Sequence, residues 1–132
     1  MLPAKQRTLI VRLLIVGAVL GMMFTVLTFA AHVLKHRDVR VEIVAKDGAV
    51  FDGMFLAHGH PVMIFSNVPA TNIMLQTRSF TFIAHPSTGA GLVTARVSLN
   101  GEFQGEAKSS EGVCGWFKPQ LGQTKAYVNS ID

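Results

Sequence analysis

The most prominent feature of the hydrophobic pattern is a long uncharged stretch near the start of the chain. Residues 13–34 contain no Asp, Glu, Lys or Arg, and His32 is their only titratable side chain. At about 1.5 Å per residue a helix of this length spans roughly 33 Å, slightly more than the hydrocarbon core of a bilayer. The pattern therefore predicts a single transmembrane helix over residues 13–34, preceded by a basic tail over residues 1–12.

A cleaved signal peptide is the alternative interpretation of this segment. The start is basic, the middle is apolar, and the small residues Thr28 and Ala30 would suit a signal peptidase. The apolar core of a signal peptide usually runs for only about 7–15 residues, however. The greater length of this stretch favours a retained signal-anchor.

The orientation of the helix has to be argued from its two flanks. Similar numbers of Lys and Arg flank its ends, so the count alone does not decide. The tail holds Lys5, Arg7 and Arg12 and no acidic residue, which is typical of a cytoplasmic segment. The long C-terminal part is translocated largely regardless of its own charge. We expect a single-pass protein with a cytoplasmic N-terminus and a periplasmic or extracellular domain.

Beyond Arg37 the pattern changes from continuous apolar residues to alternation. Val39, Val41 and Ile43 alternate with charged residues, and similar alternation recurs at residues 93–107. Several short strands of this kind predict an all-β fold, a small antiparallel β-sandwich or barrel preceded by the single transmembrane α-helix. We expect a juxtamembrane linker at 35–38 and the β domain at 39–132.

Two dipeptides typical of tight turns come directly after alternating strands: Asp-Gly at residues 47–48 and Asn-Gly at residues 100–101. Each predicts a β-hairpin between the strands that flank it. At the second turn a two-residue loop would place Ser98 opposite Phe103, crossing polar with apolar. A three-residue loop instead pairs Val97 with Phe103 on one face. We therefore expect three-residue loops with a left-handed glycine at both turns.

The excess positive charge does not belong to the domain. The chain carries a formal charge of +4, but five of its twelve basic residues flank the hydrophobic stretch. From Asp38 onward seven Lys and Arg stand against eight Asp and Glu, which leaves the domain near −1 (7 − 8). Binding to phosphates needs a cationic face, so we expect no nucleic-acid partner. The basic flanks suit anionic lipid headgroups instead.

Candidate metal ligands gather around one turn of the domain. His58 and His60 lie close in sequence to Met54 and Met63, with Met74 further along. Imidazole and thioether groups together suit copper, particularly Cu(I). The same histidines also fit an ordinary turn between strands, and methionine is a common core residue. We expect no resident cofactor, and keep copper at His58 and His60 as the alternative.

Catalytic patterns are lacking in the sequence. The carboxylates fall on solvent sides of strands, in turns or in connections, and none forms an evident acid–base pair. Cys114 is the single cysteine and has no neighbouring histidine in the sequence, so it is expected to be structural. These observations favour a protein that is not an enzyme.

The hydrophobic stretch carries small residues at a helical spacing. Gly17, Gly21 and Thr25 recur every four positions and would form one stripe on a helix. Such a stripe permits close approach of a second helix in lipid. We expect a membrane-anchored accessory or assembly subunit of a membrane or cell-envelope complex, with other membrane or envelope proteins as partners. The alternative function is a membrane-anchored copper-binding module.

Overall fold

The computed structural model describes residues 2–87, 91–120 and 125–131, which belong to two compact units divided between residues 34 and 35. The first unit is the helix α1 (Ala4–Leu34), which is long and apolar enough to span a membrane. None of its residues is buried. The helix includes most of the basic stretch expected as a tail, since Lys, Gln and Arg are themselves good helix formers. The first strand begins at Arg37, so only two residues separate it from α1.

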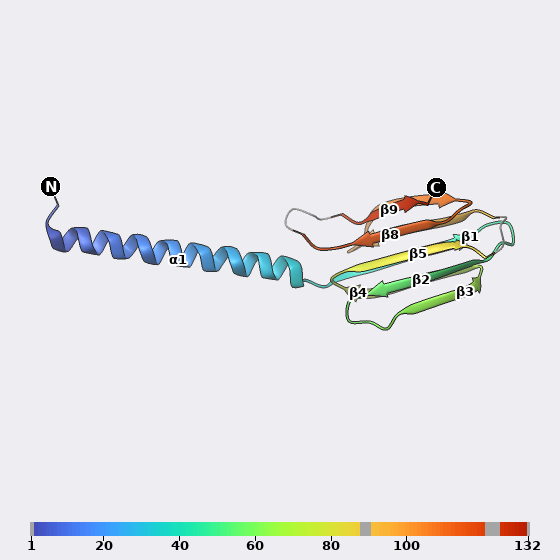
Figure 1. The fold of residues 1–132 in the computed structure, drawn as a ribbon, viewed down its shortest axis with the longest axis horizontal. Coiled ribbons are helices and arrows are strands. Elements are labelled where there is room, and N and C mark those ends of the chain that lie inside the picture. The colour runs from blue at the N-terminus through green and yellow to red at the C-terminus, as the bar shows by residue number, and fades with distance from the viewer. Residues whose placement is uncertain (1, 88–90, 121–124, 132) are drawn as a thin grey trace. The chain divides into compact units, whose positions relative to one another are not determined.

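The second unit contains nine strands among the described residues, arranged in two antiparallel sheets (Figure 1). The four-stranded sheet has the order β4 (Ala70–Thr77), β1 (Arg37–Ala45), β6 (Val93–Leu99), β7 (Glu102–Ser109). The five-stranded sheet has the order β3 (Met63–Val68), β2 (Phe51–Ala57), β5 (Phe80–Pro86), β8 (Val113–Phe117), β9 (Tyr127–Ser130). The expected all-β fold behind an N-terminal helix is confirmed, and it is a sandwich rather than a barrel.

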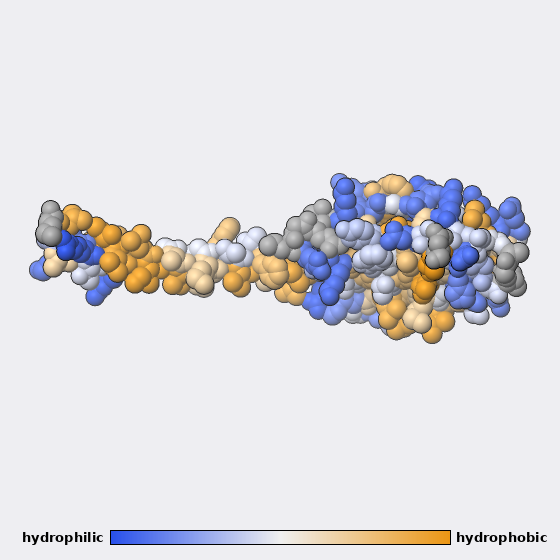
Figure 2. All heavy atoms as spheres, turned by 45° about the horizontal axis from the view of Figure 1, so that its top comes forward, coloured by the Kyte–Doolittle hydropathy of each residue, from blue (hydrophilic) through white to orange (hydrophobic). Residues whose placement is uncertain are grey.

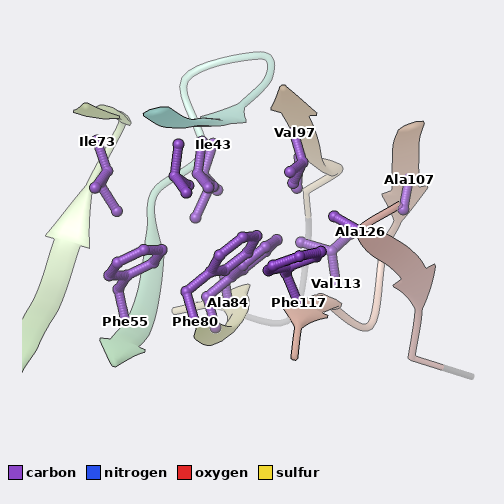
Figure 3. Close-up of a cluster of buried hydrophobic side chains, with 14 of the residues drawn as sticks. Ile43, Phe55, Ile73, Phe80, Ala84, Val97, Ala107, Val113, Phe117 and Ala126 are labelled. Carbon is purple, nitrogen blue, oxygen red and sulfur yellow. The ribbon is translucent and has the colours of Figure 1, made fainter. Parts of the chain in front are cut away.

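The core lies between the two sheets, and each sheet contributes a different kind of side chain (Figure 3). The four-stranded sheet supplies mainly aliphatic groups such as Ile43 and Val97, which are 1% and 0% exposed. The five-stranded sheet supplies phenylalanines, including Phe55, Phe80 and Phe117. The Phe55 and Phe80 rings stack with their centroids 5.7 Å apart. A flat aromatic layer against a branched aliphatic layer fills the space that two packed sheets leave.

The expected first hairpin is wrong, because β1 and β2 belong to different sheets. β1 pairs with β4 and β6, while β2 pairs with β3 and β5. The turn between them is tight, with a 3.1 Å hydrogen bond from the Ala49 amide to the Lys46 carbonyl and positive φ at residues 47–48. The strands diverge on either side of it. Their apolar sides face each other across the core, which satisfies the same alternation that suggested a hairpin.

The second hairpin forms between β6 and β7, but its predicted three-residue loop is wrong. Residues 100–101 have φ values of 50° and 79° and make a two-residue turn that places Ser98 opposite Phe103. The register then shifts at Val97, which lies opposite Gly105. This irregularity returns the apolar side of β7 to the core, so the mismatch of polar and apolar residues is confined to the end of the hairpin.

Candidate protein interaction face

The outer side of the five-stranded sheet is covered by large hydrophobic side chains. They alternate along their strands with core residues such as Phe55 and Phe82, and therefore point away from the core. Their exposed fractions range from 39% to 73%. We call this surface the apolar face; it consists of Met54, Leu56, Ile64, Ile83, Trp116 and Tyr127.

Strand pairing joins these side chains into two neighbouring rows. In one row Met54 lies opposite both Ile64 and Ile83, and Ile83 lies opposite Cys114. Because directly opposed residues are about 5 Å apart, this row crosses four strands without a break. The central strand β5 places Ile83 near the middle of the face.

The second row begins at Leu56 and ends in an aromatic pair. Leu56 lies opposite Thr81, Thr81 opposite Trp116, and Trp116 opposite Tyr127. The Trp116 and Tyr127 rings stack with centroids 5.3 Å apart at 21°. A hollow of about 450 Å³ borders this row, with Leu56, Thr81 and Trp116 in its lining. Aromatic side chains with one exposed edge are enriched where proteins bind one another.

Charge separates the two outer sides of the sandwich. In the five described strands of this sheet, Asp52 is the only Asp, Glu, Lys or Arg, whereas the four-stranded sheet carries eight. The outer side of the four-stranded sheet has the ion pairs Arg40–Glu42 at 2.7 Å and Arg96–Glu106 at 3.1 Å. Figure 2 shows a group of hydrophobic residues along the lower side of the domain in that view, and a smaller group at its upper edge. The outer side of the four-stranded sheet therefore mixes charged side chains with a few exposed hydrophobic ones, whereas the outer side of the five-stranded sheet is almost free of charge.

Asp52 lies at the border of the apolar face and has a structural role. The Asn67 amide and the Ser87 hydroxyl donate hydrogen bonds to its Oδ1 at 2.8 and 2.9 Å. These bonds, the Asn67 bond foremost, and the nearby His85 hold the pKa of the Asp52 carboxyl below its ordinary value of 3.8. The stability that the bonds contribute is present at neutral pH and is lost as pH falls through this lowered pKa. The carboxylate fixes the irregular end of β3.

The histidine pair lies in the turn between β2 and β3. His60 Nε2 donates a 2.7 Å hydrogen bond to the Gln76 carbonyl, which leaves only Nδ1 of that ring for any other ligand. Among the described residues, no group of three or more His, Cys, Asp or Glu is placed to hold a metal ion. The structure thus brings no further ligand of these types to His58 and His60.

The three candidate methionines lie on different sides of the sandwich and do not converge on one another. Met54 lies on the apolar face, Met63 packs partly buried against the core, and Met74 is 70% exposed on the other sheet. Their separation suits packing and surface roles rather than a common thioether site. Cys114 points outward beside Ile83 instead of into the core.

The small residues of α1 are accessible along the helix. A Cβ at Gly17 or Gly21 would meet no atom within 4 Å, and the Thr25 hydroxyl donates to the Gly21 carbonyl at 2.9 Å. Thr25 thereby satisfies its own polar group without a partner helix, so close packing of a neighbour would not leave it unpaired. The role of this stripe in helix packing stays a prediction.

The apolar face is the feature that alternation of residues did not reveal. Met54 and Leu56 sit in an apolar run at residues 53–57, which reads as core packing. A run without polar alternation on a strand of an antiparallel sheet does indicate that both sides are apolar. Residues 53–57, 62–65 and 79–84 contain no Lys or Glu, and this absence is the feature of the sequence that indicates the apolar face.

The chain matches no protein-family model, and no curated protein is similar to it in sequence. Two physical features therefore bear on function: a helix able to span a membrane and an uncharged apolar face on the β domain.

Proposed function

We propose that this protein is a single-pass membrane protein that serves as a non-catalytic accessory subunit of a membrane or cell-envelope complex. α1 anchors the chain in the bilayer, and the β domain binds other subunits through the apolar face. The observation that carries this proposal is the apolar face itself, with six large hydrophobic side chains that are 39–73% exposed. Asp52 is the only Asp, Glu, Lys or Arg in the described strands of this sheet.

The size of the apolar face supports a role in binding. Six large side chains at about half exposure present on the order of 500–600 Å² of surface. This is at the upper end of what the largest patch on a monomer normally shows, about 300–600 Å². At about 25 cal/mol per Å², covering it would contribute on the order of 10 kcal/mol before the entropic cost of association. A partner protein that covers the apolar face would therefore stay bound to this chain.

The proposed orientation places the basic N-terminal segment, residues 1–12, in the cytoplasm and the β domain in the periplasm or outside the cell. The basic residues at the start of α1 and the absence of acidic ones there support it. Protease added to intact spheroplasts should digest the β domain. Protection of the domain there, with digestion after permeabilisation, would reverse the orientation.

The interaction face is tested by Ile64→Lys in the intact protein, purified in mild detergent. Ile64 is 73% exposed, so a lysine there leaves the fold intact but places an unpaired charge in an apolar interface. We expect the variant to lose at least one polypeptide that the wild type retains, measured by quantitative mass spectrometry. Met74→Lys is the matched control, because Met74 is 70% exposed on the opposite sheet. If Ile64→Lys and Met74→Lys retain the same co-purifying polypeptides, the apolar face does not bind the partners.

The contribution of α1 is tested by Gly21→Ile in the same purification. Isoleucine inserts into lipid at least as well as glycine, so membrane levels should not change. Its bulk would push a neighbouring helix outward and forfeit close contact. We expect partial loss of partner or a smaller detergent-solubilised species, whereas Val19→Ile, off the stripe, should resemble the wild type. Full retention by Gly21→Ile would make α1 an anchor only.

A further inference from the structure

The apolar face has a complementary surface on the protein itself, because a second copy presents the same uncharged face. This point rests on the proposed function, which assigns the face to protein binding. From the surface geometry we infer that two copies of this chain pack their apolar faces together about a two-fold axis, and that this homodimer is the unit that enters larger assemblies.

Charge is the first reason to assign a second copy to the face. A face with charges of one sign repels its own copy across a two-fold axis. In the described strands of this sheet, however, Asp52 is the only Asp, Glu, Lys or Arg, and it lies at the border of the face opposite His85. Its carboxylate already accepts hydrogen bonds from Asn67 and Ser87. Homodimer interfaces are also more apolar than other interfaces, at about 65% non-polar area. The composition of this face suits one.

Area is the second reason. A stable interface buries about 800 Å² on each partner. The six side chains of the apolar face supply on the order of 500–600 Å² of this by exposure. Two further residues extend the same surface toward the required area: the exposed Thr81 in the second row and the half-buried Cys114 in the first. A face-to-face stack of two such sheets also matches the geometry in which sheets pack, with strands nearly aligned and about 10 Å between them.

The symmetry of such a dimer identifies which residues meet. Whatever direction the two-fold axis takes within the interface, a residue at the centre of the face comes to lie opposite its own copy. Ile83 holds that central place, since β5 is the middle of the five strands and Ile83 is flanked by Met54 and Cys114. The Ile83 side chains of the two copies are therefore in contact, and the single native Cys114 lies directly beside Ile83 on the neighbouring strand.

Cysteine cross-linking of the full-length protein in its native membrane tests this arrangement. The probe is Ile83→Cys in a Cys114→Ser background, treated with a short bis-maleimide. We expect a covalent dimer in several-fold higher yield than from Met74→Cys in the same background, since Met74 lies on the opposite sheet with 70% exposure. Ile64→Lys added to Ile83→Cys should lower the yield, because each copy then brings an unpaired charge into the apolar interface.

The outcomes separate this inference from the proposed function. Equal yields from Ile83→Cys and Met74→Cys, or no dimer from Ile83→Cys, would overturn the homodimer. If such a result came with partner loss in Ile64→Lys, the face would bind a different protein and the accessory role would stand. Quenching of Trp116 by brominated lipids, with purified protein in vesicles, would place the bilayer on the face and would also overturn the dimer.

Discussion

Replacing Gly115 with alanine is expected to destabilise the β domain by about 3 kcal/mol, because the position has no room for a methyl group. Gly115 lies on β8 directly opposite Phe82, and both face the core. A Cβ there would collide with the Phe82 ring, 2.7 Å from Cζ, and lie 2.9 Å from the Tyr127 carbonyl oxygen. The ring is packed in the core and the carbonyl belongs to the neighbouring strand, so neither neighbour can move without disturbing other contacts.

The measurement is urea unfolding of the detergent-solubilised chain, followed by the fluorescence of Trp116, its one tryptophan. Gly105→Ala is the matched control, because its Cβ would lie 3.6 Å from Val128 Cγ2, an ordinary contact. We expect that variant to stay within about 0.5 kcal/mol of the wild type or to be slightly more stable. Adding Phe82→Leu to Gly115→Ala should cost less than the sum of the single changes. Similar stability of Gly115→Ala and Gly105→Ala would contradict the assigned pairing of β5 with β8.

Phe55→Ala is expected to lower the free energy of unfolding by about 3–5 kcal/mol, the usual range for removing a buried ring. Phe55 is 0% exposed, and its ring stacks against those of Phe80 at 5.7 Å and Phe82 at 6.4 Å. Removing it leaves a cavity in the aromatic layer that stiff neighbouring rings cannot fill. Because domains of this size are stable by only about 5–15 kcal/mol, this single change brings the protein close to unfolding.

The same urea titration measures this effect against two comparisons. Phe55→Leu keeps most of the volume and should cost less than about 1.5 kcal/mol. Phe103→Ala removes a ring that is 58% exposed on the other sheet, where the Arg96 guanidinium lies over it at 5.2 Å. That variant should lose less than about 1 kcal/mol. A loss from Phe55→Ala no greater than that from Phe103→Ala would show that the aromatic layer is not the core.

The candidate site could be predicted from the sequence only in part. Local composition was enough to locate α1 and its small residues, because a helix that spans a bilayer needs a run of consecutive apolar residues, which is visible in the sequence. The apolar face is different: Met54, Ile83 and Trp116 come from strands distant in sequence, and their adjacency depends on the order β2-β5-β8. The histidine pair shows the opposite case. His58 and His60 are neighbours in sequence, yet the fold adds no third ligand of the types that bind metals among the described residues.

By itself the sequence determined the apolar helix, the all-β character of the domain, and the inward side of each regular strand, since these depend on period and length. Only the tertiary structure decided which strands pair. The alternation in β1 is satisfied equally by a hairpin with β2 and by facing β2 across the core, so it does not distinguish them. The register shift at Val97 likewise allowed a turn that alternation alone had disfavoured. Which strands pair depends on how all the buried side chains pack together in one core. No single segment of the sequence contains this information.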